Sequence, residues 1–74
     1  MAAVMSPDAP QYEISGMKLA NELLSAPCRQ MWNSRQVISF GEMAYRRYIA
    51  LGLYEKADGF RRMCYIIAQT RGAA

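Results

Sequence analysis

The sequence predicts an all-α fold, a small bundle of three main helices and one short helix whose last two helices form an antiparallel hairpin. Apolar residues recur at helical spacing along most of the chain, and no segment keeps the two-residue alternation of a half-buried strand. A chain of 74 residues has room for one domain only. We therefore expect a flexible tail over residues 1–7 and a single helical domain over residues 8–72.

The first predicted helix spans Ala9 to about Leu24. Asp8 and Gln11 have the spacing of a capping box, and Pro10 falls in the first turn, where its missing N–H costs little. The apolar residues that follow repeat at helical spacing: Tyr12, Gly16, Met17, Leu19, Ala20, Leu23 and Leu24. We expect this stripe to face the core.

A short second helix is predicted from Ala26 to about Asn33. Ser25 is its expected N-cap, and Pro27 is tolerated because it falls within the first turn. Residues 33–36 show no apolar period, so they are expected to form a connector.

The third predicted helix begins near Phe40. Ser39 and Glu42 form a Ser-x-x-Glu capping box, and Ile38 and Met43 have the spacing of a hydrophobic staple. The expected buried stripe consists of Phe40, Met43, Ala44, Tyr48 and Leu51.

Gly52 is expected to end this helix, because glycine adopts a left-handed backbone without steric cost. The fourth helix is predicted from about Tyr54 to Thr70. The residues at heptad-like spacing along it are Leu53, Ala57, Phe60, Cys64, Ile67 and Arg71. Since very few residues join the last two helices, they must fold back on each other as an antiparallel pair.

The residues around this turn follow a known spacing. Four residues have the spacing of the Tyr, Gly, Tyr and Ala of a tetratricopeptide motif: Tyr48, Gly52, Tyr54 and Ala57. Residues 41–70 therefore resemble a single tetratricopeptide-type helical hairpin. Three positions depart from the motif: Ala44, Tyr45 and Arg61. The resemblance implies two closely packed antiparallel helices.

Charge is unevenly distributed along the chain. The net charge of +3 divides into −2 over residues 1–27 and +5 over residues 28–74. A basic segment is typical of a protein with an anionic partner, and it is equally typical of a solvated surface. Nucleic-acid binding is therefore a minor alternative.

The sequence contains two cysteines, Cys28 and Cys64, and no histidine. Two thiols cannot complete a zinc site within one chain, so we expect no metal site. We expect reduced thiols in a cytoplasmic protein rather than a disulfide, and neither a secretion signal nor a membrane segment.

No catalytic constellation or phosphate-binding glycine loop is present, so we expect neither an enzyme nor a cofactor. Glu55 and Asp58 lie one helical turn apart, but they are better interpreted as acids near a positive helix end. Cys28 beside Arg29 is at best a reactive thiol, and a structural cysteine is the simpler interpretation.

Two arginine doublets, Arg46-Arg47 and Arg61-Arg62, fall on the predicted hairpin. We expect Arg47 and Arg61 to border the apolar stripe and the other two to point outward. With neighbouring tyrosines they either form a basic and aromatic patch for RNA or an acidic protein groove, or cover the edge of the core.

Large apolar residues are in excess for so short a chain. Six methionines, five tyrosines, two phenylalanines and one tryptophan exceed what a small fold buries, and arginine outnumbers lysine seven to two, as in protein interfaces. We expect a non-enzymatic regulatory or adaptor protein that binds a protein partner, with homodimerisation as a further option. The expected anchors are Trp32, Tyr45, Arg46, Tyr48 and Arg62.

Overall fold

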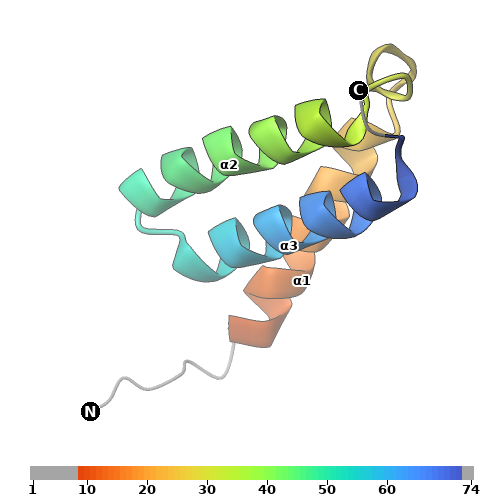
Figure 1. The fold of residues 1–74 in the computed structure, drawn as a ribbon. Helices are drawn as coiled ribbons and strands as arrows, with labels where there is room; N and C mark the ends of the chain where they lie inside the picture. Colours follow the sequence, from red (N-terminus) through yellow and green to blue (C-terminus); the bar gives the residue numbers. More distant parts are fainter. Residues whose placement is uncertain (1–8, 73–74) are drawn as a thin grey trace.

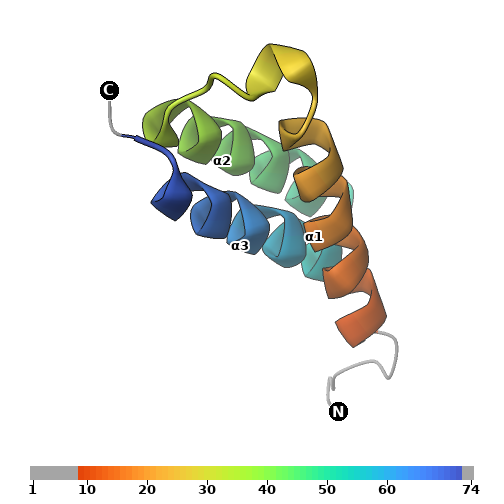
Figure 2. The same ribbon diagram turned by 90° about the vertical axis from the view of Figure 1, so that its right-hand side faces the viewer.

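The computed structural model describes residues 9–72 of the chain. Its elements are α1 (Ala9–Leu24), the 3-10 helix η1 (Pro27–Arg29), α2 (Ser34–Ala50) and α3 (Tyr54–Thr70). Helices α2 and α3 lie side by side as an antiparallel hairpin, and α1 crosses against α3 (Figures 1 and 2). The predicted all-α bundle is confirmed; the predicted tail and the cap at Asp8 lie outside the described residues.

Helix α1 packs on α3 where each helix has a glycine. A Cβ at Gly16 would meet the carbonyl oxygen of Lys56 and would lie 2.9 Å from the amide nitrogen of Phe60. A Cβ at Gly59 would meet the carbonyl oxygen of Glu13. The missing side chains therefore let the two backbones touch, which explains why two helix-weakening residues stand inside helices.

The core lies between the three helices and is small. Its buried apolar residues are Ala20, Leu24, Val37, Ala57, Phe60, Cys64 and Ala68. The Phe60 ring lies at the centre, with ring centroids 5.6 Å from Phe40 and 5.7 Å from Tyr48. Between α2 and α3, a Cβ at Gly41 would lie 2.7 Å from the Cβ of Cys64, so glycine also allows close packing here.

Helix α2 begins six residues before its predicted start, at Ser34 instead of Phe40. The side-chain oxygen of Asn33 accepts a hydrogen bond from the Gln36 amide at 2.9 Å, and the Gln36 side chain accepts one from the Asn33 amide at 2.9 Å. The prediction that residues 33–36 form a connector is wrong, because Asn-x-x-Gln is itself a capping box.

The earlier start adds Val37 and Gly41 to the apolar stripe of α2, so the centre of the buried face lies away from Met43. Val37 and Gly41 are buried, and Ala44 and Tyr48 continue their line against α3. Met43 was predicted to lie in this buried stripe, but it is exposed on the opposite side.

The hairpin turn is formed as predicted. Gly52 has a φ of +80°, and its N–H donates to the carbonyl of Ile49 at 2.9 Å. The N–H of Leu53 donates to the carbonyl of Tyr48, also at 2.9 Å, which completes a Schellman motif. Leu51, which was predicted to be buried, is exposed beside this turn.

Arg71, just after α3, holds the segment that joins α1 to α2. The predicted second helix is reduced there to the three residues of η1. The guanidinium of Arg71 donates to four backbone carbonyls: Arg29 at 3.1 Å, Gln30 at 3.2 Å, Trp32 at 2.7 Å and Leu24 at 3.4 Å. One side chain therefore fixes the path of a connection that has little regular structure of its own.

Candidate partner-binding surface

A shallow groove runs along the solvent side of α2, next to the end of the η1 connection. It has a volume of about 250 Å³ and is lined by Trp32, Gln36, Ser39, Phe40 and Met43, and we call it the α2 groove. The Trp32 ring meets the Phe40 ring nearly edge-on, with centroids 5.4 Å apart. The groove therefore has an apolar floor and one exposed thioether at its side.

Trp32 is held in this groove from two directions. The Arg29 guanidinium lies 5.7 Å from the centroid of the Trp32 ring and 5.5 Å from that of Phe40. The Trp32 carbonyl accepts the shortest of the Arg71 hydrogen bonds. Fixed aromatic side chains of this kind bind with a small loss of conformational entropy.

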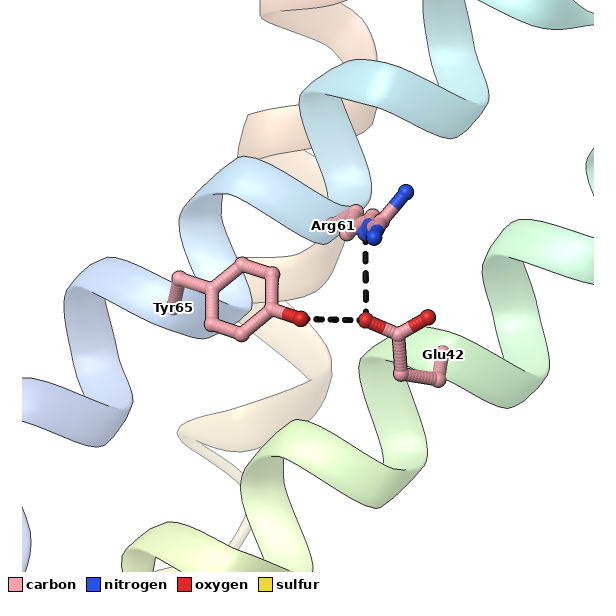
Figure 3. A network of polar contacts seen from close by, with 3 residues as sticks. All are labelled: Glu42, Arg61 and Tyr65. Carbon is pink, nitrogen blue, oxygen red and sulfur yellow. Dashed lines mark hydrogen bonds and ion pairs between the residues drawn. The ribbon is translucent and has the colours of Figure 1, made fainter.

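A polar network bridges α2 and α3 on another side of the hairpin (Figure 3). The Nε of Arg61 donates to Glu42 Oε2 at 3.1 Å, and the hydroxyl of Tyr65 donates to the same oxygen. The Arg61 guanidinium also lies 4.4 Å from the centroid of the Tyr45 ring and 5.8 Å from that of Tyr65. We call these four residues the hairpin cluster.

The charged groups of the hairpin cluster are paired with each other. The Tyr65 hydrogen bond, and then the positive charge of Arg61, hold the pKa of the Glu42 carboxyl below its usual value. The Tyr65 side chain, and then the Glu42 carboxylate, raise the pKa of the Arg61 guanidinium. Both groups remain charged at neutral pH, so the cluster braces the hairpin with a bonded ion pair.

The structure does not bring the five predicted anchors together on one surface. Trp32 lines the α2 groove, Tyr45 belongs to the hairpin cluster, and Arg46 is exposed on α2. Tyr48 instead faces the core beside Phe60.

Arg62 lies on the side of α3 that faces α1. Its Nη1 is 3.1 Å from Glu13 Oε2, in a mostly exposed ion pair. Of the doublets, Arg61 is half-buried against aromatic rings, as expected, whereas Arg47 is exposed and does not border the core.

A second apolar surface surrounds the hairpin turn. Its exposed residues are Tyr12, Leu51, Leu53 and Tyr54, and we call them the turn patch. Tyr12 and Leu53 share a hollow of about 460 Å³ with Lys56, where α1 meets the turn. Tyr12 was predicted to belong to the buried stripe of α1, and that prediction is wrong.

Sequence reasoning missed the α2 groove because it placed Met43 in the core. The signal that would have revealed the groove is the Asn33–Gln36 capping box. With a helix start at Ser34, Val37 and Gly41 join Ala44 and Tyr48 in the buried line, and Met43 lies outside that line.

The two cysteines are free thiols in different surroundings: Cys28 is exposed and Cys64 is buried. Burial raises the pKa of the Cys64 thiol from 9.0 to about 11. The unfolded thiol has the ordinary pKa and releases its proton first, so this contribution to stability is present below pH 9 and is lost as the pH rises towards 11.

We therefore expect a thiol reagent to label Cys28 in the folded protein and Cys64 only on unfolding. The urea midpoint of the wild type should fall between pH 9 and about 11 more than that of Cys64→Ala. Equal slopes for the two proteins, or rapid labelling of both thiols, would contradict the packing of Cys64 against Gly41.

Comparison with protein families, curated proteins and solved structures finds no match for the chain. The resemblance of residues 41–70 to a tetratricopeptide-type hairpin therefore stays a prediction. In residues 9–72, no three Cys, Asp or Glu side chains gather closely enough to hold a metal ion. No helix within that range has the length and apolar character needed to cross a membrane.

Proposed function

We propose that this protein is a small non-enzymatic adaptor or regulator that binds a protein partner through exposed aromatic, methionine and arginine side chains. The observation that carries the proposal is the exposure of large apolar residues beside a small core. Met31, Leu51 and Met43 expose 89%, 71% and 60% of their surface, respectively. Gathered apolar surface of this kind marks interaction sites in small proteins, whereas singly scattered residues do not.

Five of the exposed large apolar residues lie in two places, Met43 in the α2 groove and the other four in the turn patch, whereas Met31 lies outside both. In the turn patch, Glu55 and Lys56 stand next to Leu53 and Tyr54. Opposite charges beside apolar groups suit a two-fold contact, in which Glu55 of one copy meets Lys56 of the other. The turn patch is therefore the surface that supports the homodimer form of the proposal.

Site-specific photo-crosslinking tests the proposal in the cells that make the protein. A crosslinking residue at Met43 or at Leu51 should give a discrete adduct with another protein or with a second copy. The matched control is Asn21, which is exposed on α1 and lies outside both surfaces. Adducts that are absent at both positions, or equal at all three, would contradict the proposal.

Nucleic-acid binding is the second candidate function. It is supported by three exposed arginines on α2: Arg35, Arg46 and Arg47. Phosphate contacts by these side chains would make the affinity fall steeply with salt. Titration of labelled RNA and duplex DNA at two ionic strengths tests this candidate, and a lack of binding at low salt removes it.

A further inference from the structure

The exposed residues of α2 form one continuous face, which includes the open side of the α2 groove. They are Arg35, Gln36, Ser39, Met43, Arg46, Arg47 and Ala50, and we call them the α2 outer face. Apart from the adjacent pairs Arg35-Gln36 and Arg46-Arg47, successive members are three or four residues apart, which is the spacing of side chains on one side of a helix.

The α2 outer face is basic and has no acidic residue. The only acidic residue of α2 is Glu42, whose carboxylate is bonded towards α3 by Arg61 and Tyr65. Among the described residues, no ion pair involves any of the three arginines of the face. Their charge is therefore available to a ligand.

The arginines flank the apolar part of this face. Arg46 and Arg47 follow Met43 by three and four residues, so they lie one turn, or about 5.4 Å along the axis, beyond it. Arg35 lies near the opposite end, beside Gln36. A ligand with one large apolar side chain in the α2 groove would thus have guanidinium groups on both sides of that anchor.

This arrangement disfavours two other occupants. Two copies that met through this face would bring arginines opposite one another, because a two-fold contact pairs the same surface with itself. The Tyr45 ring, next to Arg46 in the sequence, has the Arg61 guanidinium over it at 4.4 Å. Nucleic-acid bases would need free ring faces on which to stack.

We propose that the α2 outer face binds an acidic peptide segment of another protein, with one large apolar side chain of that segment inserted into the α2 groove. Carboxylates on either side of the apolar anchor pair with Arg35 at one end and with Arg46 and Arg47 at the other. This inference rests on the proposed protein-binding function and names the face and the chemistry of the partner.

Selection of binders to the full-length chain from a library of random peptides tests the inference. We expect the enriched peptides to be acidic and to share one aromatic or large aliphatic residue. Binding of one synthesised peptide should weaken as salt increases. Enriched peptides without an excess of acid would overturn the inference, as would a failure to enrich any peptide.

Two substitutions at exposed positions distinguish peptide binding at the α2 outer face from binding elsewhere on the surface. Met43→Glu places a negative charge in the α2 groove and should weaken binding of the selected peptide by about tenfold or more, as expected for an anchor contact. Leu51→Glu makes the same change in the turn patch and should leave binding unchanged. Both side chains are exposed, so both variants should keep the circular dichroism spectrum and melting temperature of the wild type.

The pattern of results distinguishes this inference from the broader function. Peptide binding that is lost in Leu51→Glu and kept in Met43→Glu would overturn the acidic-segment inference and leave protein binding through the turn patch. Tighter binding of labelled RNA than of the selected peptide, with the same dependence on Arg46 and Arg47, would also overturn it. Failure of both the peptide selection and the crosslinking would remove the proposed function as well.

Discussion

Gly59→Ala is expected to lower the free energy of unfolding by about 2 kcal/mol or more, with a fall in melting temperature of roughly 10 °C. The added methyl group would collide with the backbone carbonyl of Glu13, which cannot rotate away as a side chain can. Helix α1 would have to move off α3. The gain in helix propensity, about 1 kcal/mol, offsets only part of this cost.

The sign of the change in unfolding free energy for Gly59→Ala shows whether α1 and α3 touch through their backbones. If they did not, Gly59→Ala would stabilise the protein by about 1 kcal/mol, as in an exposed helix interior. Gly72→Ala, just beyond α3, is a control for the added methyl group alone, because nothing lies within 4 Å of it. Thermal and urea unfolding of the two variants give the comparison.

The same contact involves Gly16 from the other side. Gly16→Ala should also destabilise, because its methyl group would meet the carbonyl of Lys56. The double variant should lose less than the sum of the two single losses, since the first substitution already separates the helices. Additive losses would show that the two glycines act at independent contacts.

The sequence was sufficient to predict α1 and α3 but not the buried face of α2. The bounds Ala9–Leu24 and Tyr54–Thr70 follow from local signals. These signals are the helical spacing of apolar residues and Gly52, which takes the left-handed backbone conformation of the turn before α3. Two capping boxes compete at the start of α2, and both fit the same local rule. The packing of Val37 and Gly41 against α3 selects the first.

The candidate site was predicted only in part for a related reason. Residue type selected Trp32 and Arg46 as expected anchors, and both lie on or beside the surface that we propose as the binding face. It also identified Tyr48, which faces Phe60. Spacing along one helix cannot tell an interface tyrosine from a core tyrosine, because a neighbouring helix decides which side of α2 is covered.

The sequence pattern placed Arg71 at the end of the stripe of α3 but gave it no role, because its partners lie far from it in sequence. Arg71→Ala is expected to lower the free energy of unfolding by about 2 kcal/mol, since hydrogen bonds to a charged group are each worth roughly 1.5–3 kcal/mol and some carbonyls regain water. The Trp32 carbonyl loses its 2.7 Å hydrogen bond, and the connection between α1 and α2 is released.

Release of this connection should also be visible at the α2 groove. Trp32 is the only tryptophan, so its fluorescence reports directly on the groove, and we expect its emission in Arg71→Ala to shift to longer wavelength. The selected acidic peptide should bind Arg71→Ala more weakly even where the variant is fully folded. If Arg71 stabilises the fold without positioning Trp32, Arg71→Ala should lower the melting temperature but leave the tryptophan emission and the peptide affinity unchanged.

Two further variants show whether the shape of the guanidinium matters. Arg71→Lys keeps the charge but has no planar fork to reach several carbonyls at once, so it should recover only part of the lost stability. Arg62→Ala removes a mostly exposed ion pair with Glu13 and should cost less than about 1 kcal/mol. Full recovery by lysine, or equal losses for Arg62→Ala and Arg71→Ala, would show that net charge rather than the four carbonyl contacts holds this end of the bundle together.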